Sequence, residues 1–227
     1  DFLKIIFHFS SQIPFFIIIS HRFLTMISQV NELDWGKALD KLADDNFVWF
    51  DNFLDPSTCH QLRTIIRTYL DDNAFQQAAI GTGTDLQVNT EIRKDQILWI
   101  DRSDPHPAVH NYLDRIMKLV HRLNRELFLS LSGYEFHFAH YAPGSFYKRH
   151  LDVFDKRSNR LISVICYLNE NWQPGDGGEL VVYNSAISHT IAPLEGRLVL
   201  MRRDILEHEV LTAVKDRYSI TGWLCHK

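Results

Sequence analysis

The chain has 227 residues and a formal net charge of −4. This length fits one domain, and the acidic balance argues against nucleic acid as a partner, because nucleic-acid-binding domains carry clustered basic residues. Cys59, Cys166 and Cys225 are odd in number and show no C-x-x-C spacing. Neither a disulfide framework nor a zinc knuckle is expected, and a reducing cytoplasm is favoured.

Residues 1–25 contain two apolar runs, which polar residues and Pro14 interrupt. A transmembrane helix needs about 20 predominantly apolar residues, and a secretory signal needs a basic start and a small-residue cleavage site. Neither pattern is matched, so no membrane partner is expected. Because the globular pattern begins after Met26, we expect residues 1–25 to be a non-core extension, with a membrane-associated anchor as the alternative, and residues 26–227 to form a single domain.

Helical patterns dominate residues 35–128, which we expect to support the rest of the fold. A short amphipathic helix is predicted over 35–45, followed by a strand over 47–50. Asp55 and Pro56 are residue types that favour an N-cap and a first helical position. The helix after them has apolar residues at helical spacing, namely Cys59, Leu62, Ile66 and Tyr69.

Residues 71–95 are polar and small, and the run from Gly81 to Thr84 predicts the turn of a hairpin. Residues 107–128 form the clearest helical pattern. Their apolar positions recur on one face and their basic residues fall largely elsewhere, as on a solvated face.

Residues 134–225 consist of short strand-like runs separated by Pro-Gly, Gly-Asp-Gly-Gly and Glu-Gly punctuation. The runs lie at residues 134–141, 146–153, 161–169, 179–183, 189–192 and 197–201. Many short strands with glycine-rich turns are typical of a jelly roll or barrel. The expected fold is therefore α+β and mainly β, a double-stranded β-helix (a jelly-roll or cupin-like barrel) over 134–225 that is braced by the helices of 35–128.

His150 and Asp152 are two residues apart in one of these runs, and His208 opens another strand-like stretch. On a strand, residues i and i+2 face the same side, so one short strand could supply both His150 and Asp152. A His-x-Asp triplet arises roughly once by chance in such a chain, so only the combination with His208 is informative. Two imidazoles and a carboxylate form the facial triad of non-haem Fe(II) oxygenases, which leaves three positions for a bidentate oxoacid and dioxygen.

Arg217 is the candidate for holding the distal carboxylate of such an oxoacid, since an arginine fork makes two parallel charge-assisted bonds. Arg217 lies nine residues after His208, an odd number, so a turn over 212–216 must separate them. After the turn Arg217, Ser219, Thr221 and Trp223 share one polar face, which suits a pocket and places Thr221 in it.

Several segments together resemble the Fe(II)- and 2-oxoglutarate-dependent prolyl 4-hydroxylases. They are residues 141–152, 165–169, 177–180, 208–210 and 217–223. Residues 91–100 favour the branch of the oxygen-sensing prolyl hydroxylases, which modify hypoxia-inducible factor, and their prokaryotic relatives. The resemblance covers roughly residue 47 to the C-terminus and is densest from Phe138 onward.

The resemblance implies His150, Asp152 and His208 as catalytic iron ligands and Arg217 as the clamp on the 2-oxoglutarate carboxylate. It implies that Tyr167 hydrogen-bonds the same carboxylate. Tyr141 is similar to the family tyrosine that lines the cosubstrate pocket, although its spacing to His150 is one residue shorter than in the oxygen sensors.

Four residues are candidate substrate contacts. Arg160 resembles a substrate-contacting arginine, but it lies seven residues from Tyr167, so an ideal strand would place it on the other face and confine it to the pocket rim. Arg93 and Asp95 either form a salt bridge at the base of a hairpin or shape the substrate entrance. Trp223 is either a substrate contact or barrel packing.

Other metal-ligand sets stay open at this point. His137, His140 and His189 are most simply explained as core or pocket-lining imidazoles. If Asp152 were not a ligand, His137 or His140 could complete an all-histidine cupin site. Asp155 and Glu207 are weaker carboxylate candidates, because neither shares the two-residue spacing with His150.

The sequence therefore predicts a 2-oxoglutarate-dependent dioxygenase that hydroxylates a prolyl residue of a protein, with Fe(II), 2-oxoglutarate and O2 as cofactors and cosubstrates, succinate and CO2 as co-products, and ascorbate as a further candidate ligand. Elongation factor Tu is one candidate substrate. The alternatives are the same chemistry on a free amino acid, small molecule or nucleobase, and a non-catalytic metal-binding cupin.

Overall fold

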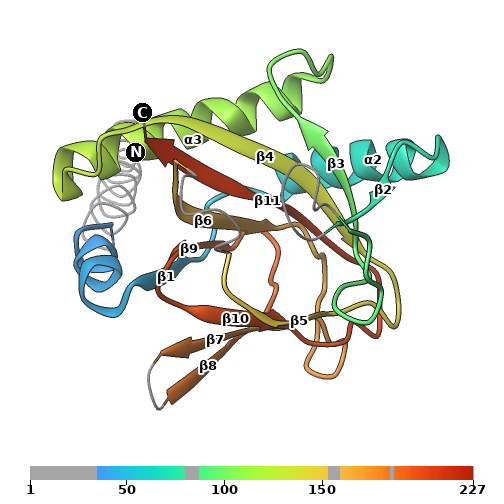
Figure 1. Ribbon diagram of the computed structural model, residues 1–227. Helices are drawn as coiled ribbons and strands as arrows, with labels where there is room; N and C mark the ends of the chain where they lie inside the picture. The colour runs from blue at the N-terminus through green and yellow to red at the C-terminus, as the bar shows by residue number, and fades with distance from the viewer. Residues whose placement is uncertain (1–34, 80–86, 153–158, 185–186, 227) are drawn as a thin grey trace, which may run out of the picture. The chain divides into compact units, whose positions relative to one another are not determined.

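The computed structural model describes residues 35–79, 87–152, 159–184 and 187–226 (Figure 1). The chain divides into two compact units, residues 1–40 and 41–227. The helix expected over 35–45 is present. The expected extension, the turn at Gly81 to Thr84, and Asp155 lie outside the described residues, and the division into an extension and one domain stays a prediction.

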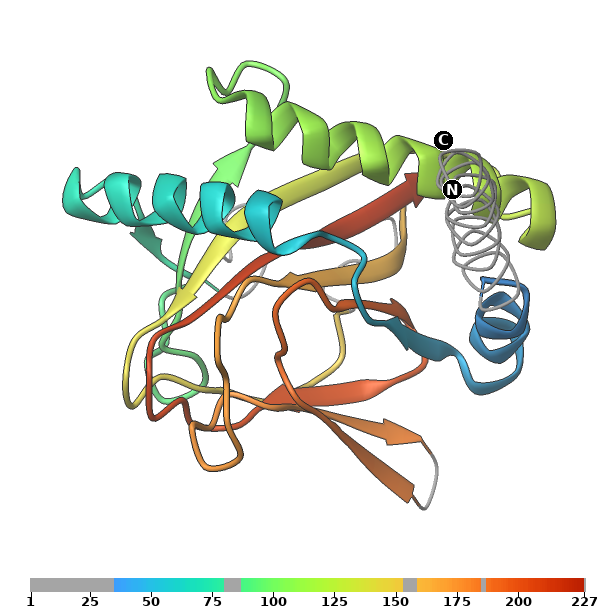
Figure 2. The ribbon, with the colours of Figure 1, turned by 180° about the vertical axis from the view of Figure 1, so that it is seen from behind.

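Residues 41–227 contain two antiparallel sheets, as expected for a double-stranded β-helix (Figures 1 and 2). The seven-stranded sheet has the order β1 (Phe47–Phe50), β9 (Leu198–Arg202), β6 (Arg160–Tyr167), β11 (Arg217–His226), β4 (Leu131–Tyr141), β3 (Gln96–Ile100) and β2 (Gln76–Gln77). The four-stranded sheet has the order β5 (Tyr147–His150), β10 (Glu207–Val210), β7 (Leu180–Asn184) and β8 (Ile187–Ile191). The expected fold class is confirmed.

Two helices, α2 (Pro56–Asp71) and α3 (Pro107–Leu127), cover the outer face of the large sheet (Figure 2). Asp55 caps α2 by accepting a hydrogen bond from the Thr58 amide over 2.9 Å, as its residue type predicts. The buried side of α3 packs on the sheet: the Tyr112 ring meets Phe136 of β4 edge-on, with 5.4 Å between centroids. Each large apolar side chain buried in this layer contributes about 1.5–3 kcal/mol.

A buried arginine anchors α2 to the connections between strands. Arg63 donates to the Leu168 carbonyl over 2.8 Å and forms ion pairs with Glu170 and Glu195. A buried guanidinium is costly unless its donors are satisfied, and here they are shared among three acceptors. The position of α2 over the sheet is therefore specified by polar as well as apolar contacts.

The space between the two sheets holds a second apolar layer and a cavity of about 620 Å³. Strand β11 separates this space from the helices. Tyr218, Ile220 and Leu224 lie on its helix side, whereas Arg217 and Thr221 line the cavity. The period-two pattern predicted for this strand is present.

Two register irregularities interrupt the pairing next to the cavity. Tyr147 of β5 pairs with Val210 of β10, and His150 pairs with His208. The two β5 residues are three positions apart, whereas their partners in β10 are only two positions apart. In β6 one extra residue lies between Arg160 and Ile162 where β11 has none. Each extra residue reverses the alternation of side chains between the two faces of its strand, so a residue beyond it points to the face opposite to the one expected. No helix in the described ranges has the length and hydropathy needed to cross a membrane.

Candidate active site

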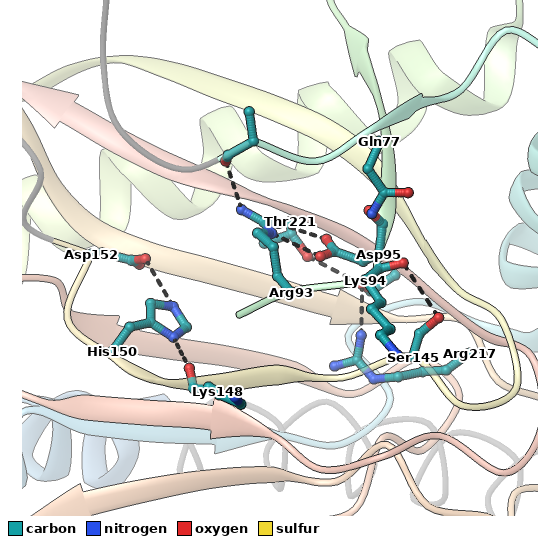
Figure 3. A network of polar contacts seen from close by, with 12 residues as sticks. Gln77, Arg93, Lys94, Asp95, Ser145, Lys148, His150, Asp152, Arg217 and Thr221 are labelled. Carbon is teal, nitrogen blue, oxygen red and sulfur yellow. Dashed lines mark hydrogen bonds and ion pairs between the residues drawn. The ribbon is translucent and has the colours of Figure 1, made fainter. Parts of the chain in front are cut away.

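Two histidines and one aspartate meet at the cavity wall, and Figure 3 shows two of them, His150 and Asp152. His150 ends β5 and is paired directly with His208 of β10. Asp152 Oδ1 lies 3.6 Å from His150 Nε2 and 3.9 Å from His208 Nε2. All three ligand atoms lie within 4.8 Å of one another, so they are close enough to hold a single metal ion.

Asp152 does not share a strand with His150, contrary to the expectation of one strand over 146–153. Strand β5 ends at His150, and Asp152 lies in the bend that follows. Its carboxylate is instead held by the large sheet: Ser163 Oγ donates to Oδ2 over 2.5 Å and Trp223 Nε1 over 3.2 Å. Because Oδ2 is occupied by these donors, Oδ1 is the oxygen that faces the two imidazoles.

Backbone carbonyls fix the tautomers of both histidines. His150 Nδ1 lies 2.7 Å from the Lys148 carbonyl, and His208 Nδ1 lies 3.2 Å from the Leu206 carbonyl. A carbonyl only accepts, so each Nδ1 carries the proton and each Nε2 presents a lone pair to the centre, as metal-binding histidines require.

The charges of these groups suit a cation. Burial lowers the pKa of His208, which keeps its imidazole neutral. Burial alone would raise the pKa of Asp152, but His208, His150 and the Ser163 hydrogen bond bring it well below its usual range. The donor set is two imidazoles and one carboxylate, which fits Fe(II) with open coordination positions.

Arg217 lies deeper in the same cavity and is 3% exposed. Its Nε donates to the Gly178 carbonyl over 2.8 Å and its Nη1 to Ser219 Oγ over 3.3 Å. The guanidinium carbon lies 4.6 Å from the Tyr141 ring centroid and 4.9 Å from that of Tyr167. Arg217 is therefore held in a fixed orientation by a carbonyl, a hydroxyl and two aromatic rings.

Gly178 makes room for this arginine. Its φ is +75°, and a Cβ at this position would lie 2.8 Å from Arg217 Cδ. A side chain would therefore displace Arg217 as well as strain the backbone. The Gly-Gly pair at 177–178 was part of the family resemblance, but its contact with Arg217 became evident only in the fold.

Tyr167 has a buried hydroxyl with no hydrogen-bond partner among the described residues. Burial raises the pKa of Tyr167, so the hydroxyl stays protonated and can donate. A buried unpaired donor of this kind costs about 1–3 kcal/mol. A carboxylate placed between Tyr167 and Arg217 would accept from both, so the site fits the distal carboxylate of an oxoacid.

The other predicted cosubstrate residues also lie at this cavity. Tyr141 and Thr221 line it, and Thr221 Oγ1 lies 3.1 Å from Ser219 Oγ, continuing the polar row that begins at Arg217. The predicted sharing of one face by Arg217, Thr221 and Trp223 is present in β11.

Arg160 lines the cavity, contrary to the expectation that it lies on the opposite face from Tyr167. The extra residue in β6 changes the alternation and returns Arg160 to the cavity side. Its guanidinium lies 3.8 Å from the Trp223 ring centroid and forms an ion pair with Glu135, Nε to Oε2 2.9 Å.

Arg93 and Asp95 form a two-pronged ion pair at the cavity entrance, with Nε–Oδ1 2.8 Å and Nη2–Oδ2 2.6 Å (Figure 3). Asp95 is 0% exposed. The pair is therefore a buried feature of the entrance and not an exposed salt bridge of small consequence.

The remaining histidines do not join the ligand group within the described residues. His137 lines the cavity between Trp99 and Trp223, and burial lowers its pKa to about 3. His140 lies 2.6 Å from Asp216. The all-histidine alternative is thus wrong for this part of the chain.

The other two weaker candidates are likewise placed elsewhere. His189 packs beside Phe47, with 5.0 Å between ring centroids. Glu207 pairs with Arg149, Nε to Oε2 2.9 Å, away from the ligand group.

Sequence reasoning missed two residues that shape the site. Ser163, which holds Asp152, shares the period-two face of β6 with Tyr167, so alternation could have found it. Tyr147 stacks on His150 although it lies three residues away. No alternation rule identifies Tyr147, because the β5 bulge brings it to the cavity face.

The chain is similar to known oxygenases. Residues 136–225 match the family model described as the 2OG-Fe(II) oxygenase superfamily. The chain is 35% identical to a Pseudomonas putida prolyl-4-hydroxylase structure, over 84% of this chain and 98% of that one, with a TM-score of 0.76.

Two animal proteins are also similar. A Trichoplax adhaerens prolyl hydroxylase, solved in complex with a hypoxia-inducible factor peptide fragment, is 29% identical over 88% of this chain and 93% of that one, with a TM-score of 0.78. A curated Caenorhabditis elegans hypoxia-inducible factor prolyl hydroxylase is 29% identical over 147 residues, which are 60% of this chain and 20% of that protein. The chain thus spans about a fifth of the length of this curated relative.

With this fold, and with two histidines, an aspartate and a buried arginine at one cavity, the chain belongs to the prolyl hydroxylases of the 2OG-Fe(II) oxygenase superfamily.

Proposed function

We propose that this protein hydroxylates a prolyl residue of a protein substrate, using Fe(II), 2-oxoglutarate and O2. The observation that carries the proposal is that the His150, Asp152 and His208 group and Arg217 line one cavity, with the buried Tyr167 ring packed beside the Arg217 guanidinium. When bound, ferrous iron supplies the oxidising chemistry, in which 2-oxoglutarate and O2 become succinate and CO2 and one oxygen atom enters a substrate C–H bond. The two histidines and Asp152 would hold the ion.

The chain's own part in this reaction is placement. Arg217 and Tyr167 would donate to the distal carboxylate of 2-oxoglutarate, and Tyr141 and Thr221 would line its pocket. The fixed guanidinium orients the oxoacid toward the three ligands, which lowers the entropy cost of the reaction. The apolar layer around the cavity limits water next to the reacting atoms.

The cavity mouth supports a prolyl substrate. Trp223, His137 and Trp99 form an aromatic wall there, and Trp99 is 53% exposed. Aromatic faces suit an aliphatic ring, and Arg160, whose guanidinium lies over Trp223, is the candidate contact for the substrate main chain. Arg93 bounds the entrance from the other side.

A protein substrate is further supported by the Trichoplax relative, whose structure contains a peptide fragment. Elongation factor Tu is one candidate that follows from the resemblance to prokaryotic relatives. A cytoplasmic location is proposed with it, because the described cysteines are buried free thiols and a reducing compartment preserves ferrous iron.

The test uses purified protein with Fe(II), 2-oxoglutarate and ascorbate, incubated with prolyl peptides and with cell extract. We expect succinate formation and one added oxygen on proline by mass spectrometry. Asp152→Ala should abolish both, whereas Asp44→Ala, which removes an exposed carboxylate, should leave them unchanged. Full turnover by Asp152→Ala would overturn the metal assignment.

Three further outcomes separate the alternatives. Arg217→Ala should raise the 2-oxoglutarate concentration required by about 10- to 100-fold, and an unchanged requirement would move the clamp elsewhere. Bound metal without 2-oxoglutarate consumption, whatever substrate is offered, would favour a non-catalytic cupin. Succinate formation with a free amino acid or nucleobase, but with no protein, would replace the prolyl substrate.

A further inference from the structure

The ring of Tyr147 lies flat against the imidazole of His150. Their centroids are 3.5 Å apart and their planes differ by 14°. Tyr147 is 7% exposed and lines the same cavity as the three candidate ligands. Both rings face the cavity because β5 contains one more residue than β10 between their pairing positions.

The opposite face of the tyrosine ring is covered by a cation. The Arg93 guanidinium carbon lies 4.2 Å from the Tyr147 ring centroid. His150 already occupies one face at stacking distance, so Arg93 must occupy the other. Tyr147 is therefore enclosed between a guanidinium and the candidate metal ligand.

Arg93 itself has little freedom to move. Asp95 holds it through two hydrogen bonds, and its Nη1 lies 3.4 Å from the Ala79 carbonyl (Figure 3). The segment around Arg93 is paired with β5: Lys148 N donates to the Ile92 carbonyl over 2.8 Å. Arg93 and Tyr147 form an isolated bridge in the same pairing.

The stack supplies an orientation that the backbone contact alone does not. The hydrogen bond from His150 Nδ1 to the Lys148 carbonyl fixes one edge of the imidazole, but the ring can still tilt about that bond. A flat aromatic ring against its face opposes this tilt and keeps Nε2 directed at Asp152.

We propose that Tyr147 is a positioning residue for His150, and that the Arg93–Asp95 pair clamps it in place. This inference rests on the proposed role of His150 as a metal ligand. It reassigns Arg93 and Asp95 from substrate contact to support of the metal site. Because the Asp95 carbonyl also accepts from Gln77 Nε2 over 3.0 Å, the segment that lines the entrance is linked to the orientation of a ligand.

The test measures Mn(II) affinity of the full chain by electron paramagnetic resonance (EPR), without 2-oxoglutarate or turnover. Tyr147→Leu removes the ring and should raise the Mn(II) dissociation constant about 10- to 100-fold and broaden the bound spectrum. Tyr147→Phe retains the ring and should stay within about twofold of the wild type. Rescue by Phe separates the stack from any role of the hydroxyl.

Two further variants complete the comparison. Arg93→Lys keeps the charge but loses the fork, and should weaken Mn(II) binding to an intermediate degree. Phe146→Leu alters the neighbouring aromatic residue, whose carbonyl accepts from Lys94 N and whose ring centroid lies 5.2 Å from Lys94 Nζ, and should leave Mn(II) binding unchanged. Melting temperatures without metal identify variants that are unfolded.

The outcomes are distinguishable. A folded Tyr147→Leu protein that binds Mn(II) like the wild type would overturn the inference. If Tyr147→Leu does not fold, the Arg93→Lys variant is the test. An Mn(II) affinity and a bound spectrum equal to those of the wild type in Arg93→Lys would also overturn the inference. If the wild type itself does not bind Mn(II), the proposed metal site is wrong.

Discussion

Trp223 donates its indole hydrogen to Asp152 Oδ2 over 3.2 Å, beside the donor from Ser163. Both donors belong to the seven-stranded sheet, whereas His150 and His208 belong to the four-stranded sheet. An ion at this site would therefore join the two sheets. Trp223 thus has a role at the candidate metal centre in addition to its place at the cavity mouth.

Removal of these donors should weaken metal binding. Ser163→Ala and Trp223→Phe each leave Oδ2 with one donor, so the carboxylate loses its fixed orientation. We expect the Mn(II) dissociation constant to rise about 10-fold in each variant and about 100-fold in the double variant. EPR titration measures this, with Trp99→Phe at the exposed mouth as the control. Wild-type affinity in the double variant would contradict the assignment.

Gly178→Ala should impair 2-oxoglutarate binding and spare the metal. The new Cβ would lie 2.8 Å from Arg217 Cδ, so the guanidinium must shift, and the positive φ adds a backbone cost of about 1–2 kcal/mol. Gly175→Ala is the matched control, because its φ is +99° but nothing lies within 4 Å of its Cβ. Calorimetric titration with 2-oxoglutarate should show weaker binding only for Gly178→Ala; equal affinities in both variants would argue against it.

Tyr167→Phe should have opposite effects on stability and on cosubstrate affinity. The buried hydroxyl has no partner among the described residues, so its removal should leave the free energy of unfolding unchanged or raise it by about 1 kcal/mol. The same change removes a donor to 2-oxoglutarate and should weaken its binding about 5- to 10-fold. Tyr112→Phe removes a second such hydroxyl, on the buried face of α3, and should leave 2-oxoglutarate binding unaltered. Urea unfolding measures the change in the free energy of unfolding, and calorimetry measures the change in 2-oxoglutarate affinity.

His137→Phe should reduce the loss of stability in mild acid. The pKa of His137 is about 3 in the folded protein, against 6.5 for an exposed imidazole, because of burial and the nearby Arg93. Between these values the unfolded chain binds a proton that the folded one does not, so the free energy of unfolding is intact above pH 6.5 and falls as the pH drops toward 3. The free energy of unfolding should therefore fall less between pH 7 and pH 5 in the variant than in the wild type, by up to about 2 kcal/mol. Urea titrations at both pH values measure it, and parallel declines would contradict the prediction.

Much of the fold was predictable because its elements follow simple periodicities. The Asp55 cap, the apolar face of α3 and the alternation in β11 all follow from the residues themselves. The residues that meet at the cavity were largely predictable as well, since His150, Asp152, His208 and Arg217 were all singled out in advance.

What could not be predicted depends on where pairing stops or slips. Asp152 was assigned to a strand because it alternates with His150, but β5 has lost its partner by that point. Arg160 was placed on the wrong face because an extra residue in β6 is defined only against its neighbour β11. The contact between Gly178 and Arg217 likewise joins segments that lie 39 residues apart in the chain, which no local pattern reveals.

The β5 bulge makes the number of residues between Tyr147 and His150 as important as their identity. A chain shortened by one residue there would still contain every side chain of the site, yet its aromatic ring would turn outward and leave the imidazole uncovered. Engineering of this protein should accordingly treat the spacing of the segment as fixed and restrict changes to substitutions.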